Sequence, residues 1–230
     1  MIEKSPSAAS GGSESDVAKE RAADIINRFH ALYYEGMGGH PVWKRTYWMG
    51  VPVSKCPLDM WIYQEILHEM RPDLLIETGT FMGGSALYFA HIFDQIGHGR
   101  IISVDIETLP RPAHPRIQYL HGSSADPQIV EQIRASRNPD DKTMVVLDSD
   151  HSAGHVYEEL RLLSPFVSSG HYLVVEDSNV NGRPVLPQFG PGPYEAVQTF
   201  LSEHANFSPD FSREKFMMTW NPDCWLKRMA

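Results

Sequence analysis

Short apolar segments alternate along the chain with stretches in which apolar residues recur every three or four positions. The apolar segments are expected to be strands, at residues 73–78, 100–105, 117–120, 143–148 and 171–177. The periodic stretches are expected to be helices, at residues 83–93, 127–136, 155–166 and 193–204. This alternation is typical of βαβ units, and strands that are apolar throughout indicate a mostly parallel sheet covered on both faces. The pattern therefore predicts the α/β fold class.

Further elements are expected at both ends of this α/β unit. Two helices, at residues 16–35 and 57–70, precede the first strand and are expected to cover the open side of the sheet. After the last helix, FSPDF and KFMMTW (215–220) are expected to form an antiparallel pair, which would bring the sheet to seven strands. Residues 179–193 contain several prolines and glycines, which excludes regular structure, so this stretch is a candidate mobile lid.

The length of 230 residues fits one α/β domain. We expect a disordered tail at residues 1–15, which are polar and rich in Ser and Gly, followed by a single domain at residues 16–230. The tail lacks the apolar segment of a secretory signal, and no apolar run approaches the roughly 18 residues of a membrane helix. We therefore expect a cytoplasmic protein without a membrane span.

Charge and cysteine content narrow the range of partners. The net charge of -9, without a stripe of Lys and Arg, disfavours binding to the phosphates of nucleic acids. Cys56 and Cys224 are far apart, which argues against a disulfide framework or a thiolate zinc site, so both are expected to be reduced. The partner is therefore expected to be a small or neutral molecule.

Carboxylates gather at the expected carboxyl ends of the strands, where open parallel sheets bind their ligands. Carboxylates are poor strand residues and are costly to bury unpaired, so folding alone does not explain this placement. The residues are Glu77, Asp105, Glu107, Asp148, Asp150, Glu176 and Asp177, with His151 beside them.

The first turn after a strand, ETGTFMGGS (77–85), has features of a donor-binding site. A phenylalanine stands where a nicotinamide-binding turn has its second glycine, which disfavours a dinucleotide. Gly79 and Gly83 permit close approach of the backbone to a ligand. Glu77 offers a carboxylate to an ammonium group, and Asp105 can accept hydrogen bonds from two ribose hydroxyls. These properties match S-adenosylmethionine, with a turn of purely structural glycines as the alternative.

Three carboxylates are candidates for a metal site. Asp148, Glu176 and Asp177 follow two strands that are neighbours in common doubly wound sheets, and converging carboxylates repel one another unless a cation lies between them. Oxygen ligation favours a hard ion such as Mg²⁺. Helix capping by Asp148, Asp150 and Ser152 is the alternative, but it leaves Glu176 unexplained.

His151 is a candidate general base, because it lies three residues after Asp148 and could take the proton of a substrate hydroxyl. A solvated histidine without a role is the alternative. His155 completes the spacing of a zinc site, but the glutamate of the H-E-x-x-H pattern is missing, which disfavours zinc.

Five stretches together resemble the cephalosporin hydroxylase/rhamnosyl O-methyltransferase family. This family comprises Mg²⁺-dependent class I methyltransferases related to the O-methyltransferases of macrolide sugars and methylmannose polysaccharides. The resemblance implies a seven-stranded, Rossmann-like class I methyltransferase fold, a three-layer sandwich with extra N-terminal helices. The stretches are GVPVSKCPLDMWIYQEI (50–66), IETGTFMGGS (76–85), VVLDSDHSAGHVYEEL (145–160), YLVVEDS (172–178) and GPGPYEAV (190–197).

The resemblance also implies S-adenosylmethionine as donor, Mg²⁺ as the ion, and a hydroxyl of a sugar or oligosaccharide as acceptor. His151 and Asp148 would be catalytic, and Asp148, Glu176 and Asp177 would hold the metal. The aromatic segment near residue 47 and the 179–193 loop are expected to shape the acceptor pocket, and a homo-oligomer is expected. The donor site would consist of Glu77, Gly79, Gly83, Ser85, Asp105, Gly122, Ser123, Ser124 and Asp148.

Three other functions compete with this interpretation. One is a methoxylation component that acts on a cephalosporin-like scaffold together with a partner protein. Another is a noncatalytic accessory subunit that binds S-adenosylmethionine. The third is an Fe(II) oxygenase that uses His151, His155 and a carboxylate as its facial triad.

Overall fold

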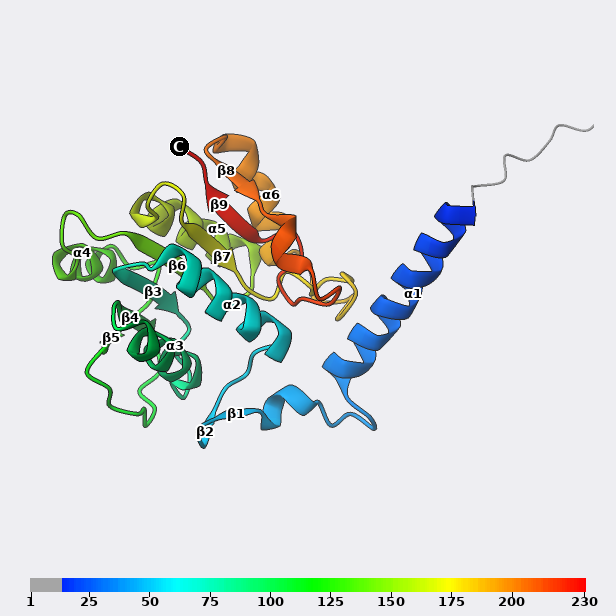
Figure 1. The fold of residues 1–230 in the computed structure, drawn as a ribbon, viewed down its shortest axis with the longest axis horizontal. Coiled ribbons are helices and arrows are strands. Elements are labelled where there is room, and N and C mark those ends of the chain that lie inside the picture. Colours follow the sequence, from blue (N-terminus) through cyan, green and yellow to red (C-terminus); the bar gives the residue numbers. More distant parts are fainter. Residues whose placement is uncertain (1–13) are drawn as a thin grey trace, which may run out of the picture.

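The computed structural model describes residues 14–230 and has helices on both faces of a central sheet (Figure 1). The strands of this sheet are β3 (Leu74–Thr78), β4 (Arg100–Asp105), β5 (Ile117–His121), β6 (Thr143–Leu147), β7 (Tyr172–Val175), β8 (Phe207–Pro209) and β9 (Trp225–Arg228). Their order is β5-β4-β3-β6-β7-β9-β8. The first five run parallel to one another, and β9 is antiparallel to both β7 and β8. The predicted seven-stranded α/β fold is confirmed.

Helices and a small hairpin complete the described chain. The α-helices are α1 (Glu14–Glu35), α2 (Pro57–Met70), α3 (Gly84–Ile96), α4 (Pro127–Ser136), α5 (Ala153–Leu163) and α6 (Pro193–Glu203). The short helices are η1 (Val42–Arg45), η2 (Ser164–Phe166) and η3 (Phe211–Glu214), and the hairpin is β1 (Tyr47–Trp48) with β2 (Val51–Pro52).

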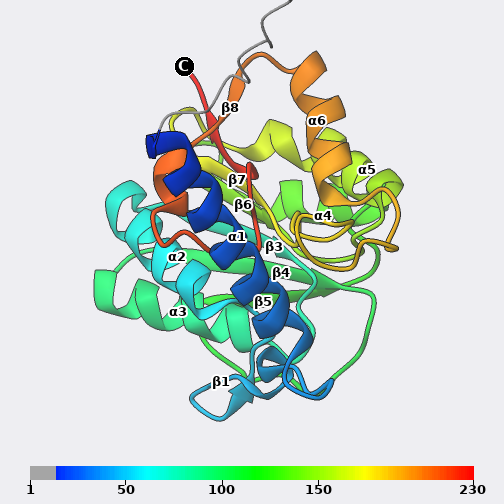
Figure 2. The ribbon, with the colours of Figure 1, turned by 90° about the vertical axis from the view of Figure 1, so that its right-hand side faces the viewer.

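The sheet separates two apolar cores. Successive side chains of a strand point to opposite faces, so Ile76 and Val145 pack on one face with α4, α5 and α6. Leu75 and Val146 pack on the other face with α2 and α3. Figure 2 shows α2 and α3 on one side of the sheet and α4, α5 and α6 on the other. Burial on both faces explains why the strands are apolar throughout, since each such side chain stabilises the fold by roughly 1.5–3 kcal/mol.

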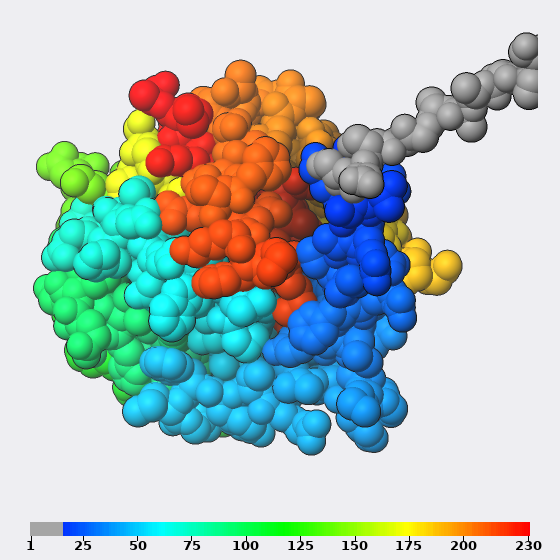
Figure 3. Space-filling model, turned by 45° about the vertical axis from the view of Figure 1, so that its right-hand side comes forward, coloured from blue at the N-terminus to red at the C-terminus, as the bar shows by residue number. Residues whose placement is uncertain are grey.

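The expected strand at residues 215–220 is wrong. The last strand is β9, ten residues further along, and it pairs with β8. Residues 215–220 remain irregular because Met218 and Trp220 pack with Cys56 in a separate cluster, beside Tyr33 of α1. Figure 3 shows the end of α1, in blue, against the orange segment that precedes β9.

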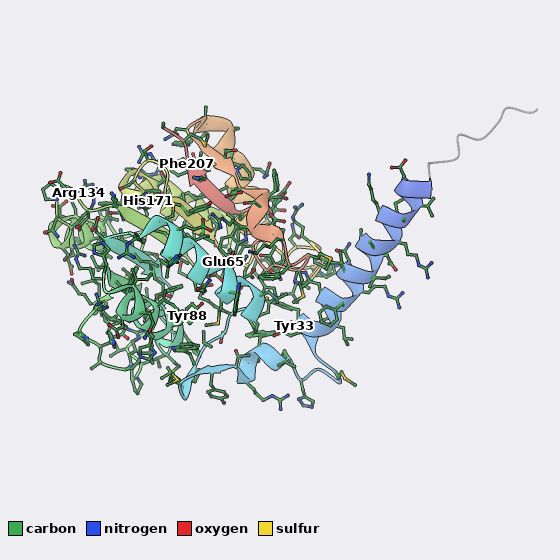
Figure 4. All side chains as sticks on the ribbon, in the orientation of Figure 1. Tyr33, Glu65, Tyr88, Arg134, His171 and Phe207 are labelled. Carbon is green, nitrogen blue, oxygen red and sulfur yellow. The ribbon has the colours of Figure 1, made fainter. Side chains whose placement is uncertain are left out.

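The expectation that the first helix covers the sheet is also wrong. α2 covers the sheet, but α1 extends away from the body and meets it toward its C-terminal end, through His30, Tyr33 and Tyr34 (Figures 1 and 4). Four apolar side chains of α1, Val17, Ile25, Phe29 and Leu32, are 53% to 59% exposed.

Other expectations about the chain have mixed outcomes. Both cysteines are free and buried, as predicted. No helix within residues 14–230 is long and apolar enough to cross a bilayer. The expected tail lies largely outside the described residues, although α1 already begins at Glu14. The division into a tail at 1–15 and one domain at 16–230 stays a prediction. So does the mobile lid at 179–193, where Val185 is fully buried.

Replacing Trp225 by Ala tests the assignment of the last strand. The Trp225 side chain is completely buried and packs between α2 and the sheet, so the change should lower the free energy of unfolding by about 3–5 kcal/mol. Trp61 is 58% exposed, and Trp61→Ala should cost less than about 0.5 kcal/mol. Urea denaturation measures the change in unfolding free energy for both variants. Equal losses of stability in Trp225→Ala and Trp61→Ala would contradict the structure.

Candidate active site

A cavity of about 860 Å³ lies at the carboxyl edge of the parallel strands, where sheets of this type bind ligands. It extends from the loops after β3, β4 and β5 to those after β6 and β7. Glu77, Gly83 and Glu176 do not line it. The predicted residues that do are Gly79, Ser85, Asp105, Gly122, Ser123, Ser124, Asp148, His151 and Asp177.

Asp148, His151 and Asp177 form an acidic centre in this cavity. Their ligand atoms lie within 4.8 Å of one another. β6 and β7 are parallel neighbours with Leu147 opposite Val175, so the residues that follow them come side by side. His151 Nε2 lies 3.2 Å from Asp177 Oδ2 and 4.0 Å from Asp148 Oδ1. Asp177 Oδ1 is buried without a partner among the described residues, which is costly unless a cation or donor reaches it.

A buried lysine links two of the carboxylates. Lys55 is 2% exposed, and its Nζ donates to Asp148 Oδ2 at 2.7 Å and to Glu176 Oε1 at 2.6 Å. The hydroxyl of Tyr63 donates to the same Glu176 oxygen at 2.5 Å. One ammonium therefore bridges two carboxylates at the ends of adjacent strands.

Burial and charge act in opposite directions on this group. Burial lowers the pKa of Lys55, but the charges of Asp148 and Glu176 outweigh burial and raise it above its usual range. Burial also raises the pKa of both carboxyl groups, and the Lys55 charge opposes that rise. The ion pair thus favours the ionised carboxylates in a site that otherwise favours their neutral forms.

Lys55 is a functional residue that the sequence prediction missed, although it lies in one of the stretches that carry the resemblance. The sequence indicates such a lysine only indirectly, because several carboxylates expected at one sheet edge require a cation nearby. Nothing local identifies this lysine as that cation, since its partners lie 93 and 121 positions away in the chain.

Glu176 is separated from the acidic centre by these contacts. Its Oε1 already accepts hydrogen bonds from Lys55 and Tyr63. Among the described residues, Glu176 does not belong to the group formed by Asp148, His151 and Asp177. Asp177 takes the turn after β7 with a φ of 57° and lines the cavity instead. The role of Glu176 as a metal ligand stays a prediction.

Glu77 lies beneath the cavity and is fully buried. Its Oε2 accepts a hydrogen bond from the Ser103 hydroxyl at 2.6 Å, whereas Oε1 is buried without a partner among the described residues. Burial raises the pKa of Glu77 to about 7, against the opposing charge of Lys55. The free oxygen is suited to an ammonium group.

Asp105 lies at the edge of the cavity and is held from two sides. Its Oδ2 accepts from the Phe81 backbone at 2.6 Å and lies 3.2 Å from Arg111, and its Oδ1 accepts from the Glu107 backbone at 2.8 Å. A ribose bound here would share this carboxylate with Arg111.

The glycines of the first turn are largely structural. Gly79 has a φ of +80°, and a Cβ there would lie 1.7 Å from the backbone oxygen of Asp148, so β3 and β6 can approach only with glycine. Gly83, with a φ of +79°, precedes α3 and faces Pro112 and Tyr119. Gly79 still lines the cavity, but Gly83 does not.

The segments that were expected to shape the acceptor pocket do not supply the aromatic residues that line the cavity. Trp48 packs on Tyr88 with ring centroids 4.8 Å apart, and neither it nor any residue of 179–193 lines the cavity. The aromatic residues that line it are Tyr34, Trp43 and Trp220, together with Phe81.

The family model described as Rhamnosyl O-methyltransferase/CmcI matches residues 40–229. The chain belongs to this family. It is 46% identical over 212 residues to the rhamnosyl O-methyltransferase of Mycobacterium tuberculosis, a match that covers 89% of this chain and 85% of the relative. The rhamnosyl O-methyltransferase of Mycobacterium leprae is 45% identical over 197 residues, with 83% and 84% covered.

Solved structures of CmcI show the same fold. Its apo-structure aligns with a TM-score of 0.65 at 19% identity, covering 85% of this chain and 81% of CmcI. A CmcI structure with Mg and SAM aligns with a TM-score of 0.62 at 18% identity, with the same coverage. Membership of the rhamnosyl O-methyltransferase/CmcI family confirms the predicted resemblance and the predicted enzyme class, an S-adenosylmethionine-dependent O-methyltransferase.

Replacing Lys55 by Met should leave Asp148 and Glu176 buried without their cation. The loss in unfolding free energy should be about 3–5 kcal/mol. Lys215→Met is the matched control, because Lys215 binds Glu65 at the surface and should contribute less than about 1 kcal/mol.

The loss at position 55 should be larger at pH 8 than at pH 6. Without Lys55 the folded-state pKa of both carboxyl groups rises further above the unfolded value, so stability falls as pH rises. Thermal or urea unfolding at the two pH values measures this, and a loss independent of pH would contradict the pairing.

Proposed function

We propose that this protein transfers the methyl group of S-adenosylmethionine to a hydroxyl of a rhamnosyl or related sugar, in a reaction that depends on Mg²⁺. The observation that carries the proposal is the position of His151 between two carboxylates in the cavity, in a chain 46% identical to a rhamnosyl O-methyltransferase. The proposal treats residues 16–230 as one methyltransferase domain.

The residues on the β3, β4 and β5 side of the cavity suit the donor. The carboxylate of Glu77, buried behind the cavity wall with Oε1 unpaired, would attract the ammonium of the methionine part toward Ser85, which does line the cavity. Asp105 would bind the ribose hydroxyls, as Asp commonly does after the second strand of such folds. Gly122, Ser123 and Ser124, which follow β5, would face the adenine.

The acidic centre suits a hard divalent cation. The orphaned Oδ1 of Asp177 and the nearby carboxylate of Asp148 are oxygen ligands of the kind that Mg²⁺ prefers. Glu176 would contribute through Oε2, since Oε1 already accepts from Lys55 and Tyr63. When bound there, the ion would hold the acceptor hydroxyl and lower its pKa.

His151 would act as general base on the acceptor hydroxyl. Asp177 Oδ2, 3.2 Å from His151 Nε2, would orient the imidazole. The acceptor oxygen bonds to the methyl carbon as the bond from carbon to sulfur breaks, the hydroxyl proton passes to His151, and S-adenosylhomocysteine leaves. Alignment of donor and acceptor in one cavity supplies much of the rate.

The iron oxygenase alternative loses support. His155 Nε2 lies 3.2 Å from the Ser124 hydroxyl and 3.1 Å from that of Ser149. Among the described residues, His155 is not part of the acidic centre that contains His151.

The location and assembly are part of the same proposal. We place the enzyme in the cytoplasm, where its donor is made and free thiols such as Cys56 and Cys224 stay reduced. A homodimer would cover the exposed stripe of Val17, Ile25 and Phe29 on α1. A second copy offers the same stripe, which makes the contact self-complementary.

His151→Ala should lower kcat by about 10²–10⁴-fold, because the acceptor proton loses its base. The donor Kd, measured by calorimetry, should stay unchanged. His98→Ala is the control, since His98 binds Asp73 at the surface. Normal turnover of the His151 variant would show that another group takes the proton.

Asp177→Asn should weaken divalent metal binding by at least about tenfold. Mn²⁺ titration followed by electron paramagnetic resonance measures this without turnover. Asp94→Asn, which alters an exposed carboxylate paired with Arg116, should leave metal binding unchanged. Equal Mn²⁺ affinity in both variants would exclude Asp177 as a ligand.

The double change Ile25→Glu and Phe29→Glu should convert the dimer to a monomer, because it places charge in the apolar stripe. Light scattering after gel filtration gives the mass. Asn27→Glu, on the opposite side of α1, should preserve the dimer, and a monomeric wild-type protein would refute the assembly.

A further inference from the structure

An aromatic wall closes one end of the active-site cavity, and the proposed chemistry does not use it. Tyr34 near the end of α1, Trp43 of η1 and Trp220 before β9 line the same cavity as His151 and Asp177. Their ring centroids lie 5.6 Å apart for Tyr34 and Trp43, 5.2 Å for Tyr34 and Trp220, and 5.8 Å for Trp43 and Trp220.

The wall is fixed from behind. The indole N–H of Trp43 donates to the backbone oxygen of Tyr34 at 2.8 Å. Trp220 is buried, its backbone N–H donates to buried Asp59 at 2.8 Å, and its ring meets the other two edge to face. Tyr34 and Trp43 are only partly buried, so they supply the accessible surface of the wall.

The wall lies opposite the donor half of the cavity. Along the sheet, the proposed donor residues follow β5, β4 and β3, and the acidic centre follows β6 and β7. Trp220 lies five residues before β9, which is on the far side of β7. In-line transfer places the acceptor oxygen on the side of the methyl carbon away from sulfur. The acceptor therefore belongs at the aromatic end.

We propose that Tyr34 and Trp43, backed by Trp220, form an acceptor subsite that binds the apolar face of a neutral 6-deoxyhexose unit. This inference rests on the proposed sugar methylation and names the part of the chain that selects the sugar. Aromatic rings bind flat C–H surfaces, and a methyl group in place of the C6 hydroxymethyl group leaves no polar atom to desolvate against them.

Charge and hydrogen bonding at this end agree with a neutral sugar. Asp148 and Asp177 disfavour a phosphorylated acceptor, as does the net charge of -9. Burial, with the charges of Asp177 and Asp148, raises the pKa of Tyr34 above its usual range. Its hydroxyl stays protonated and can donate a hydrogen bond to a sugar oxygen.

The test compares methyl rhamnoside with methyl mannoside, which differ only in the C6 hydroxyl when matched in ring configuration. Trp43→Leu should raise the KM for the rhamnoside by about tenfold and reduce the preference for the rhamnoside by a similar factor. The calorimetric Kd of S-adenosylmethionine should stay unchanged, which also shows that the variant folds. Trp61→Leu, outside the cavity, should change none of these values.

A second measurement uses the wild-type protein with S-adenosylhomocysteine and Mg²⁺. In saturation-transfer NMR, irradiation of aromatic protein protons should transfer most strongly to the C6 methyl group of the rhamnoside. Transfer should be weaker in Trp43→Phe and weaker still in Trp43→Leu, where Tyr34 is the accessible aromatic ring of the wall that remains. Unchanged transfer in Trp43→Leu would contradict the subsite.

The outcomes separate the two proposals. If the wild-type enzyme methylates no sugar, the proposed function fails and this subsite fails with it. If the wild-type enzyme methylates the rhamnoside but Trp43→Leu keeps its KM, only the subsite is wrong. An equal rise in KM for both sugars would overturn the assignment of a 6-deoxyhexose.

Discussion

The ion pairs of Lys55 with Asp148 and Glu176 make this acidic sheet edge possible. β6 and β7 are parallel neighbours, and each is followed by carboxylates that the fold brings together. Glu176 is buried, and Asp148 and Asp177 line the cavity. Lys55, itself buried, lies 2.7 Å and 2.6 Å from the two carboxylates. Such a pair is costly to assemble and more costly to break. Its value here is that the Lys55 charge opposes the effect of burial, which raises the pKa of Asp148 and of Glu176, while Asp177 faces the cavity.

The division of the cavity follows from the strand order. The donor residues follow the strands on one side of Asp148, and the aromatic wall lies beyond β7 on the other side. His151 stands between these halves with Asp177 beside it. In the proposed reaction, the topology would align methyl donor, base and acceptor before any of them needs to move, which is how a fixed site lowers the entropic part of a barrier.

Much of the fold was predictable because both faces of the sheet are covered. Strands buried on both faces are apolar throughout, so they stand out in the sequence as short apolar runs. The sheet edge then located most of the residues that line the cavity, and the acidic centre among them. The prediction failed where contacts between residues far apart in the sequence determine the local structure. Lys55 and the aromatic wall depend on partners far away in sequence, and 215–220 has strand-like residues that pack with α1 instead. The helix at residues 16–35 was expected to cover the sheet, but four apolar side chains of α1 are exposed.

The measurement that tests the central claim most directly is the release of S-adenosylhomocysteine from S-adenosylmethionine with methyl rhamnoside, first with Mg²⁺ and then with EDTA. The structure and the family lead us to expect turnover with Mg²⁺, its loss in EDTA and its recovery when Mg²⁺ is restored. Turnover that EDTA leaves unchanged would contradict the role given to the acidic centre. Donor binding without turnover of any sugar would contradict the proposed reaction.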